Sequence, residues 1–240
     1  MFSIEFIKNN IGYILSAIPV TLNIVILSVF FASVLGGFYA WAIVRRVIGI
    51  NILAEVLISL GRSTPVLVML YFIFYVYPYI KISLFHEPLS HIAASKLAPD
   101  VAAILTLSLV FSAYFSEVFR SALNAVDKGQ HEAGVVVGLS NFTCFRRIIL
   151  PQAMKSGLPN YTNVVIDLIK DSSLVYSITV IDVMARANIA AARGFHFVES
   201  YVVVLFVYIA LCFIFTRILR WLENRLSKKW YGNETKINVF

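Results

Sequence analysis

Residues 9–44 read NNIGYILSAIPVTLNIVILSVFFASVLGGFYAWAIV, a run of 36 residues without a charged side chain. A helix that crosses the hydrocarbon core of a bilayer needs about 20 apolar residues, so this run exceeds one crossing. We expect a membrane-spanning helix at Ala17–Val44, with Pro19 in its first turn, where a missing backbone N–H is tolerated. A cleaved signal peptide fits poorly, because the apolar stretch is too long and Ala40-Trp41-Ala42 comes too late for a cleavage site.

The composition of the whole chain agrees with a membrane protein. Hydrophobic residues make up 60% and charged residues 14%, and the mean hydropathy is +0.83, whereas soluble domains average roughly 45–50% apolar and about 25% charged residues. This argues against a soluble enzyme, a disordered chain or a free nucleic-acid binder. We attribute the net charge of +7 to Lys and Arg in cytoplasmic loops, with lipid rather than nucleic acid as the partner. Cys144 and Cys212 lie in no motif and predict neither a disulfide framework nor a metal site.

Four further apolar runs predict the remaining spans: Ser63–Ile80, Val101–Ser116 (extending toward Arg120), Ser156–Ser177, and Ser200–Thr216, which continues as an amphipathic tail, Arg217–Lys229. The fourth span is the least apolar, because it contains Asp167, Lys170 and Asp171. The runs are apolar on all sides, unlike the alternating strands of a membrane barrel. The expected fold is therefore an all-α polytopic membrane protein, with about five transmembrane helices in a single domain that covers residues 1–240.

Basic residues predict the orientation of these spans. Of the 20 Lys and Arg residues, 14 fall on one side of the predicted layout and 5 on the other, and Lys170 lies within a span. The side rich in Lys and Arg should be cytoplasmic, which puts the N-terminus outside and the C-terminus inside. The outer segments are then 81–100, where we expect Pro88 and Pro99 to break helix, and 178–199, with a short helix around Asp182–Ala192. The largest inner loop is Asn124–Lys155.

This inner loop contains the stretch KGQHEAGVVVGLSNFTCFRRIILPQA, residues 128–153. Glu132 is expected in the first turn of a short helix, where a carboxylate suits the positive end of the helix dipole. Gly138 is placed to end that helix, Ser140 or Asn141 to cap a second one, and Pro151 to end the second. The stretch therefore predicts two short helices joined at a glycine on the cytoplasmic face.

The same stretch resembles the signature of the permease subunits of binding-protein-dependent ABC importers. That signature is Glu-Ala-Ala, three residues, Gly, about nine residues, then Ile-x-Leu-Pro. Here it reads Glu132-Ala133-Gly134, Gly138 and Ile148-Ile149-Leu150-Pro151. Gly134 stands where the family usually has Ala, which we interpret as a tolerated exchange of small residues that costs the helix about 1 kcal/mol.

Further motifs resemble the polar amino-acid branch of that family. Arg62-Ser63-Thr64-Pro65 is similar to Arg-Gly-Thr-Pro, and Ala113-Tyr114 with Glu117 and Arg120 to Ala-Tyr-x-x-Glu-x-x-Arg. Gly129-Gln130 stands before the signature as in that branch, and Lys170-Asp171-Ser172-Ser173-Leu174 is similar to Lys-Asp-Thr-Ser-Leu. The departures are Ser at positions 63 and 172. The motifs cover about residues 60–180.

The resemblance implies an ATP-driven importer in the cytoplasmic membrane of a bacterium. An extracellular or periplasmic binding protein would deliver the solute, two permease subunits would form the pathway, and two ATPase subunits would bind ATP and Mg. The chain has no GxxxxGK[ST] segment, so it lacks a phosphate cradle of its own and is expected to be a transport subunit rather than an enzyme, without a cofactor. The resemblance assigns ATPase coupling to Gly129, Gln130, Glu132, Ala133, Gly134, Gly138, Ile148, Leu150 and Pro151.

The candidate pathway or gate residues are Arg62, Thr64, Pro65, Glu117, Lys170, Asp171, Ser172 and Ser173. Charges at membrane depth cost about 2.5–3.5 kcal/mol each, so Lys170 and Asp171 should face protein or water. They either line the pathway or form a structural ion-pair cluster with Asp167. Glu117 and Arg120 are three residues apart and can pair as a lock or as a gate. Arg62 is interpreted as an interfacial anchor, and Thr64-Pro65 as either a helix irregularity in the pathway or an ordinary helix start.

Some alternatives remain open at the level of sequence. The four histidines, His86, His91, His131 and His196, have no metal-ligand spacing, so no metal is expected. A secondary transporter would usually show more spans and internal repeats, and a membrane enzyme or scaffold is the other competing function. The segment Ala191–Tyr201 is similar to cystine permeases, which favours a sulfur amino acid as the substrate. The sequence does not decide between a homodimer and a heterodimer.

Overall fold

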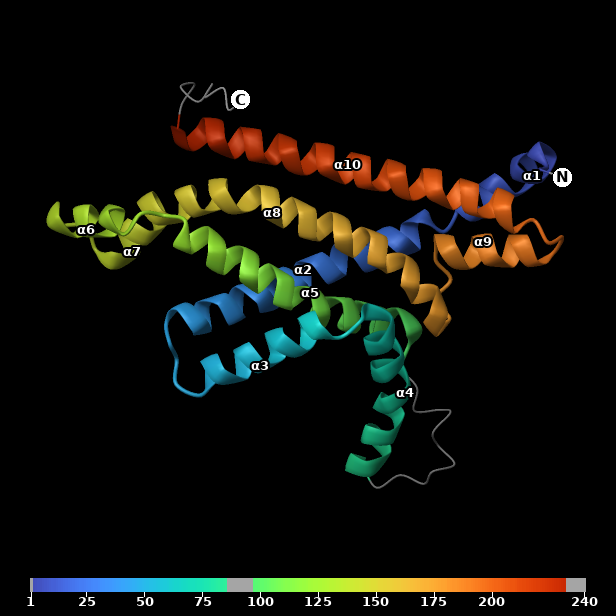
Figure 1. The fold of residues 1–240 in the computed structure, drawn as a ribbon, viewed down its shortest axis with the longest axis horizontal. Coiled ribbons are helices and arrows are strands. Elements are labelled where there is room, and N and C mark those ends of the chain that lie inside the picture. Colours follow the sequence, from blue (N-terminus) through green and yellow to red (C-terminus); the bar gives the residue numbers. More distant parts are fainter. Residues whose placement is uncertain (1, 86–96, 232–240) are drawn as a thin grey trace.

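The computed structural model describes residues 2–85 and 97–231, and all regular secondary structure in these two ranges is helical (Figure 1). The elements are, in order, α1 (Ile4–Leu15), α2 (Ile18–Val44), α3 (Ile50–Ser63), α4 (Val66–Phe85), α5 (Pro99–Asn124), α6 (Lys128–Val136), α7 (Asn141–Cys144), η2 (a π-helix, Phe145–Ile149), α8 (Leu150–Asp171), η3 (a 3-10 helix, Ser172–Ile178), α9 (Val183–Ala192) and α10 (Phe197–Tyr231).

Four helices in the described ranges are long and apolar enough to cross a membrane: Ile18–Val44, Val66–Leu84, Pro99–Asn124 and Phe197–Leu226. They correspond to four of the five expected spans, and the first begins one residue from its predicted start. The helix α8 has 22 residues but is not among the four. Its charged side chains, which include Lys155, Asp167, Lys170 and Asp171, lower its average hydropathy.

The central element is α5, which packs against α2, α3, α4 and α8. It approaches α2 closely at Gly36, where an added Cβ atom would lie 2.7 Å from the carbonyl oxygen of Ser112 and 2.8 Å from Cβ of Phe115. Small residues at such crossings let membrane helices pack backbone to backbone. The large buried side chains on α5, among them Leu107 and Phe115, belong to one hydrophobic core shared with α2, α4, α8 and α10.

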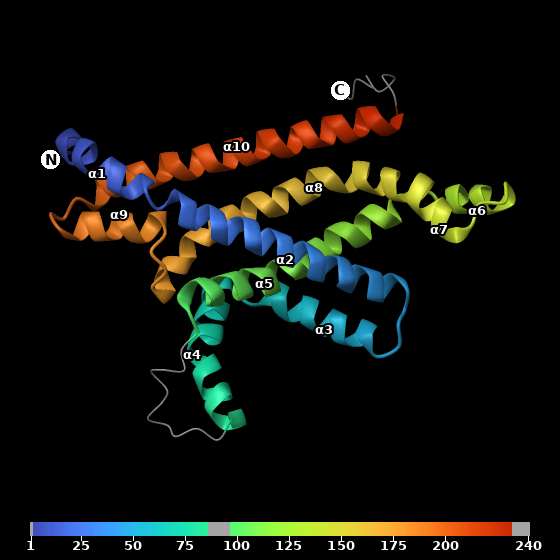
Figure 2. The same ribbon diagram turned by 180° about the vertical axis from the view of Figure 1, so that it is seen from behind.

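The long helices α2, α5, α8 and α10 run between two distinct ends of the molecule, whereas α4 projects to one side, across their direction (Figure 1 and Figure 2). One end holds α6, α7, the connection from α2 to α3, and the C-terminal ends of α5 and α10. The opposite end holds α1, α9 and the start of α10. The basic pair Arg45 and Arg46 lies in the connection at the first end. The helix α3 runs from that end only partway along α5, so Arg62 lies farther from it than the predicted layout implied.

The second predicted span, Ser63–Ile80, is wrong at its start. The segment before it forms a separate amphipathic helix, α3, which buries Ala54, Ile58 and Gly61. This helix was not predicted. It ends because Pro65 disfavours helical geometry in the preceding residue, and Thr64 is extended, with φ −102° and ψ 129°. The spanning helix α4 then begins at Val66 and continues to Phe85.

Of the two prolines expected to break helix in the first outer segment, one does not do so and the other is not described by the structure. Pro99 does not break a helix but opens α5, because the first helical positions need no N–H donor. Pro88 lies outside the described residues. The short helix expected around Asp182–Ala192 is confirmed as α9, with Asp182 as its N-cap.

Pro151 does not end the second helix of the inner loop, contrary to expectation. The chain continues through α7, η2 and α8 without a break. In the π-helical turn the N–H of Leu150 reaches back five residues to the carbonyl oxygen of Phe145. This turn widens the helix just before Pro151, which takes an early α8 position where its missing N–H is tolerated. The helix instead ends at Asp171, where the tighter η3 begins, and Thr179 closes η3 with φ +70°.

Candidate functional site

The first candidate site is the α6–α7 element at one end of the molecule (Figure 1). Asp127 caps α6, and its side chain accepts a hydrogen bond from the Gly129 N–H at 2.6 Å. Glu132 is the fifth residue of α6 rather than part of its first turn, which contains no acidic residue. The carboxylate at the positive helix end is therefore that of Asp127, and the sequence interpretation placed it one turn too late.

The turn between the two helices forms as predicted. Gly138 has φ +80°, a conformation that favours glycine, and its N–H donates to the Val135 carbonyl oxygen at 2.9 Å. Ser140 caps α7, because its side chain accepts from the Thr143 N–H at 3.3 Å.

Inside the element, α6 lies directly on Cys144. The Gly134 position is so close that an added Cβ atom would lie 2.6 Å from Cys144 Sγ. The Cys144 side chain is fully buried, and its Sγ donates to the carbonyl oxygens of Gln130 at 3.9 Å and His131 at 3.8 Å. Glycine at 134 is thus a steric requirement of this chain, not only a tolerated exchange for Ala. Nothing in the sequence signature singled out Cys144.

The outer surface of the element is apolar. Glu132 and Ala133 are exposed, and so are four large side chains: Val135 (48%), Val136 (85%), Val137 (74%) and Phe142 (71%). Ile148, Leu150 and Pro151 are partly or fully buried, so they join the element to α8 rather than contribute to its surface. Several large exposed apolar side chains on one short element at one end of the molecule are typical of a protein interaction site.

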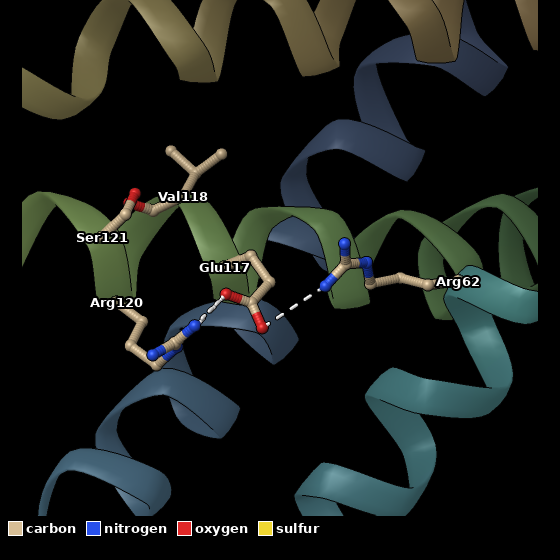
Figure 3. Close-up of polar contacts among 5 residues, drawn as sticks. All are labelled: Arg62, Glu117, Val118, Arg120 and Ser121. Atoms are coloured by element: carbon tan, nitrogen blue, oxygen red, sulfur yellow. Dashed lines mark hydrogen bonds and ion pairs between the residues drawn. The ribbon is translucent and has the colours of Figure 1, made fainter.

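A second candidate site joins α3 to α5 (Figure 3). The Glu117 carboxylate accepts from Arg120 Nη2 at 2.5 Å and lies 3.5 Å from Arg62 Nη1. The pair between Glu117 and Arg120 was predicted, and Arg62 is an additional partner. The three side chains are a third to a half exposed. They line an open pocket of about 580 Å³, whose other lining residues are Ile43, Glu55, Ile58, Ser59 and Ser63.

A third candidate site lies between α8 and α10. Lys170 Nζ donates to Asp167 Oδ1 at 3.0 Å, and both side chains are about 60% exposed. They line a pocket of about 590 Å³ together with Pro159, Thr162, Asn163, Ile166, Thr216, Arg220 and Glu223. This pocket shares no lining residue with the one between α3 and α5. The structure therefore separates Arg62 and Glu117 from Lys170.

The remaining candidate pathway residues lie at two helix breaks. Thr64 and Pro65 separate α3 from α4, and Ser172 and Ser173 begin η3. The structure brings these breaks together, since α4 packs against η3 (Figure 1 and Figure 2). Ser172 is buried, and its Oγ donates to the Ile169 carbonyl oxygen at 2.7 Å.

Asp182 is a buried titratable group that the sequence interpretation did not assign to a site. Its side chain is fully buried and accepts from the Ala185 N–H at 2.8 Å, while Tyr208 Oη lies 3.5 Å from its second oxygen. Burial raises the pKa of Asp182 from 3.8 to about 6, although the backbone hydrogen bonds oppose the shift. Its position before a short helix was the only signal in the sequence.

No group of three or more His, Cys, Asp or Glu side chains within residues 2–85 and 97–231 is arranged to hold a metal ion.

Comparison with known protein families identifies the family to which this chain belongs. Residues 32–228 match the family model described as "Binding-protein-dependent transport system inner membrane component". The chain belongs to this family. The match includes α5, the α6–α7 element, and α8 through most of α10, so it covers all three candidate sites.

Relatives of this permease place it in the amino-acid branch. It is 37% identical, over 98% of its own length and 95% of the relative's, to the L-cystine transport system permease protein TcyL of Bacillus subtilis. It is 32% identical to the L-cystine transport system permease protein TcyB of the same organism, over 87% of this chain and 84% of the relative. A crystal structure of an amino acid ABC transporter with histidines contains a chain that aligns with a TM-score of 0.78 and 26% identity, covering 93% of this permease and 100% of that chain.

These findings confirm several predictions from the sequence. The chain is a multi-pass permease of the bacterial inner membrane, the transport subunit of an ABC amino-acid importer, and not an enzyme. The name of the family implies a binding protein as a partner, and an ABC importer also requires an ATPase. Secondary transport and a membrane enzyme or scaffold function are thereby set aside.

Proposed function

We propose that this permease crosses the membrane five times as a single domain, with its N-terminus outside, and moves an amino acid by alternating access. The fifth crossing is α8, whose 22 residues are enough for one span. It packs lengthwise against α5 and α10, both of which are candidate spans. The clustering of the basic Arg45–Arg46 connection, α6, α7 and the C-terminal part of α10 at one end supports a cytoplasmic assignment for that end.

The observation that carries the coupling role is the exposed apolar surface of the α6–α7 element. The importer would contain a pair of ATPase subunits, which bind ATP and Mg. A cleft on the ATPase would cover Val136, Val137 and Phe142, with Glu132 and Ala133 on the same helix. The internal contact between Gly134 and Cys144 makes the element compact. It continues directly into α8 through η2, so a displacement of the element moves a spanning helix.

The pathway function is assigned to the two helix breaks and to the polar surface of α8. Lys170, Asp171 and Ser173 would line a route that water or a second permease chain covers, because exposed charges at membrane depth are costly. Ser172, which is buried, would support the helix break beside this route. Thr64 and Pro65 join this route at the adjacent break. Arg62 and Glu117 lie in the separate pocket, where with Arg120 they act as a gate or as a structural lock.

For the substrate we propose cystine or a related sulfur amino acid, delivered by an extracellular or periplasmic binding protein. The support is that two relatives, TcyL and TcyB, are described as L-cystine permeases. In proteoliposomes that contain the complete importer and its binding protein, cystine should stimulate ATP hydrolysis more than glutamine or histidine does. Equal stimulation by all three would contradict the choice of substrate but not the importer function.

The coupling role is tested by reversing one exposed charge. Glu132→Lys should abolish uptake and weaken co-purification of the ATPase about tenfold or more, equivalent to about 1.4 kcal/mol, while the subunit stays in the membrane. Glu132→Gln should retain part of the uptake and part of the ATPase co-purification. Glu5→Lys is the matched control, because Glu5 is also exposed on a helix but lies at the opposite end of the molecule. Normal uptake by Glu132→Lys would refute the coupling assignment.

A further inference from the structure

The short helix α1 has no role in the proposed transport mechanism, yet it is firmly attached to the molecule. The Ser3 N–H donates to Glu199 Oε1 at 2.8 Å, and the Phe6 ring stacks on the His196 ring with centroids 4.4 Å apart. At the other end of α1, Arg186 Nη1 donates to the Tyr13 carbonyl oxygen at 3.1 Å. Twelve residues are marginal for an isolated helix, so these contacts with α9 and α10 fix its position.

The surface of α1 is divided into three strips along its axis. At 3.6 residues per turn, the strip that faces α9 and α10 contains Phe6, Ile7, Asn10 and Ile14, of which Ile14 is fully buried. A second, outward strip is polar or small and exposed, and consists of Glu5, Asn9 and Gly12. A third, also outward, is apolar and exposed: Ile4 (64%), Ile11 (40%) and Leu15 (37%).

The charge pattern agrees with this division. Lys8 is exposed and lies between the outward apolar strip and the outward polar strip, where its aliphatic stem can follow one while its ammonium group reaches the other. A helix with one apolar and one polar outward face, and a basic residue at the boundary, is the pattern of helices that lie in the plane of a membrane interface.

The position of α1 in the chain fixes its depth. Only Ser16 and Ala17 separate it from α2, the first candidate span, so the C-terminal end of α1 lies next to the start of that span. Its anchors are Glu199 and His196, at the start of α10, another candidate span. The two neighbouring candidate spans also carry exposed apolar side chains, Ile26 and Phe30 on α2 and Val198 and Leu205 on α10, which lipid covers in a membrane.

We infer that α1 is an interfacial lipid-binding helix, with Ile4, Ile11 and Leu15 inserted among the acyl chains of the leaflet next to it and with Glu5, Asn9 and Gly12 toward water. The occupant of the apolar strip is phospholipid, because α1 directly precedes one candidate span, is anchored at the start of another, and has a polar face that borders the strip. The assignment to the outer leaflet rests on the proposed orientation. The contact with lipid does not.

The test compares two adjacent positions that face in different directions at nearly the same height. Ile11→Cys and Gly12→Cys are made in a background without native cysteines (Cys144→Ala, Cys212→Ala), and each is spin-labelled in the complete complex in phosphatidylcholine–phosphatidylglycerol vesicles. Position 12 has open space around it, so a side chain is accommodated there. Accessibility is measured with oxygen, which partitions into lipid, and with a nickel chelate, which stays in water.

The expected result is a ratio of oxygen to nickel accessibility well above one at position 11 and below one at position 12. A high nickel accessibility at position 11 would overturn the proposal in favour of an aqueous surface. Low accessibility to both reagents at position 11 would overturn it in favour of a protein partner. The measurement requires no transport, so its failure is distinguishable from failure of the proposed import function.

A second measurement applies if the cysteine-free background does not assemble. Ile11→Trp and Gly12→Trp are compared in the native background against the unmodified complex, in vesicles with and without brominated phospholipid. Bromine should quench the added fluorescence at position 11 more than at position 12. Equal quenching at the two positions would overturn the proposal.

Discussion

At the scale of single residues, Asp182 makes stability depend on pH. Its pKa rises from 3.8 to about 6 on burial, so folding favours the neutral acid. The stabilisation linked to this group is complete below pH 3.8 and is lost as pH rises through about 6, a change of about 3 kcal/mol. Asp182→Asn keeps the oxygen that caps α9 but does not ionise. We expect it to raise the melting temperature of the detergent-solubilised complex by several degrees at pH 7.5.

The control for this prediction is the same comparison at pH 4.5. There the folded-state carboxyl is largely protonated but the unfolded-state carboxyl is still mostly ionised, so the difference in melting temperature should shrink to about a third of its value at pH 7.5. A difference in melting temperature that is equal at pH 4.5 and 7.5 would contradict the account, since it would show that ionisation of Asp182 does not affect the folded state.

Glu117 is the shared member of a charge cluster and should matter more than either arginine. Its carboxylate contacts both Arg62 and Arg120, so Glu117→Gln removes the paired carboxylate of both guanidinium groups at once and leaves Glu55 as the acid of the pocket. Arg62→Gln removes only the 3.5 Å contact and leaves the shorter pair intact, and we expect a loss of less than about 1 kcal/mol. Melting temperatures of the two variants test this order. A larger loss for Arg62→Gln would indicate a role for Arg62 outside the cluster.

At the scale of elements, the contact between Gly134 and Cys144 should decide whether the α6–α7 element forms. Gly134→Ala puts a Cβ atom 2.6 Å from Cys144 Sγ. We expect the overpacking to cost roughly 1–3 kcal/mol and to reduce both uptake and ATPase co-purification. Cys144→Ala removes the sulfur, so the double variant should recover most of the lost activity.

The matched control for this prediction is Gly12→Ala, because position 12 is also a helical glycine but has open space around it. It should leave uptake unchanged. Failure of the double variant to recover activity would mean that Gly134 is needed for contact with the partner rather than for packing inside the element.

An element could be predicted from the sequence when its cause lies within a few neighbouring residues, and it was missed when its cause lies in packing against another element. Ala17–Val44, the Gly138 turn and the Asp182 cap follow from composition or from one residue's conformational preference, and they were predictable. The helix α3 was missed because its amphipathic pattern is short and its buried face is defined only by α5. The uninterrupted helix through Pro151 depends on a π-helical turn, which no single residue specifies.

In the candidate sites, too, contacts between neighbouring residues were predictable and contacts between separate helices were not. The Glu117–Arg120 pair is a local spacing and was predictable, whereas Arg62 joins it only because α3 packs on α5. The steric relation between positions 134 and 144 joins two helices across a turn and has no counterpart in either helix alone. Motif spacing thus located the sites, and tertiary packing determined which side chains meet.

At the scale of the whole molecule, the number of crossings depends on α8. Length and composition identify four candidate spans, and the proposed layout needs α8 as a fifth. If α8 crosses, Ala125 and Arg193 lie on opposite sides of the membrane, because α8 is the only proposed span between them. Alkaline phosphatase, which is active only outside the cytoplasm, should then be inactive when fused after Ala125 and active when fused after Arg193.

A fluorescent protein fused after Phe240 completes the test, because it should fluoresce only if the C-terminus is cytoplasmic. If α8 does not cross, the phosphatase is inactive at both positions and α10 carries the C-terminus to the outside, so fluorescence is lost. The charges of Asp167, Lys170 and Asp171 oppose insertion of α8 as an isolated helix. Packing against α5 and α10, and a water-filled or protein-covered polar face, would offset that cost. Activity of the Arg193 fusion together with fluorescence at Phe240 would therefore show that α8 crosses the membrane despite these charges.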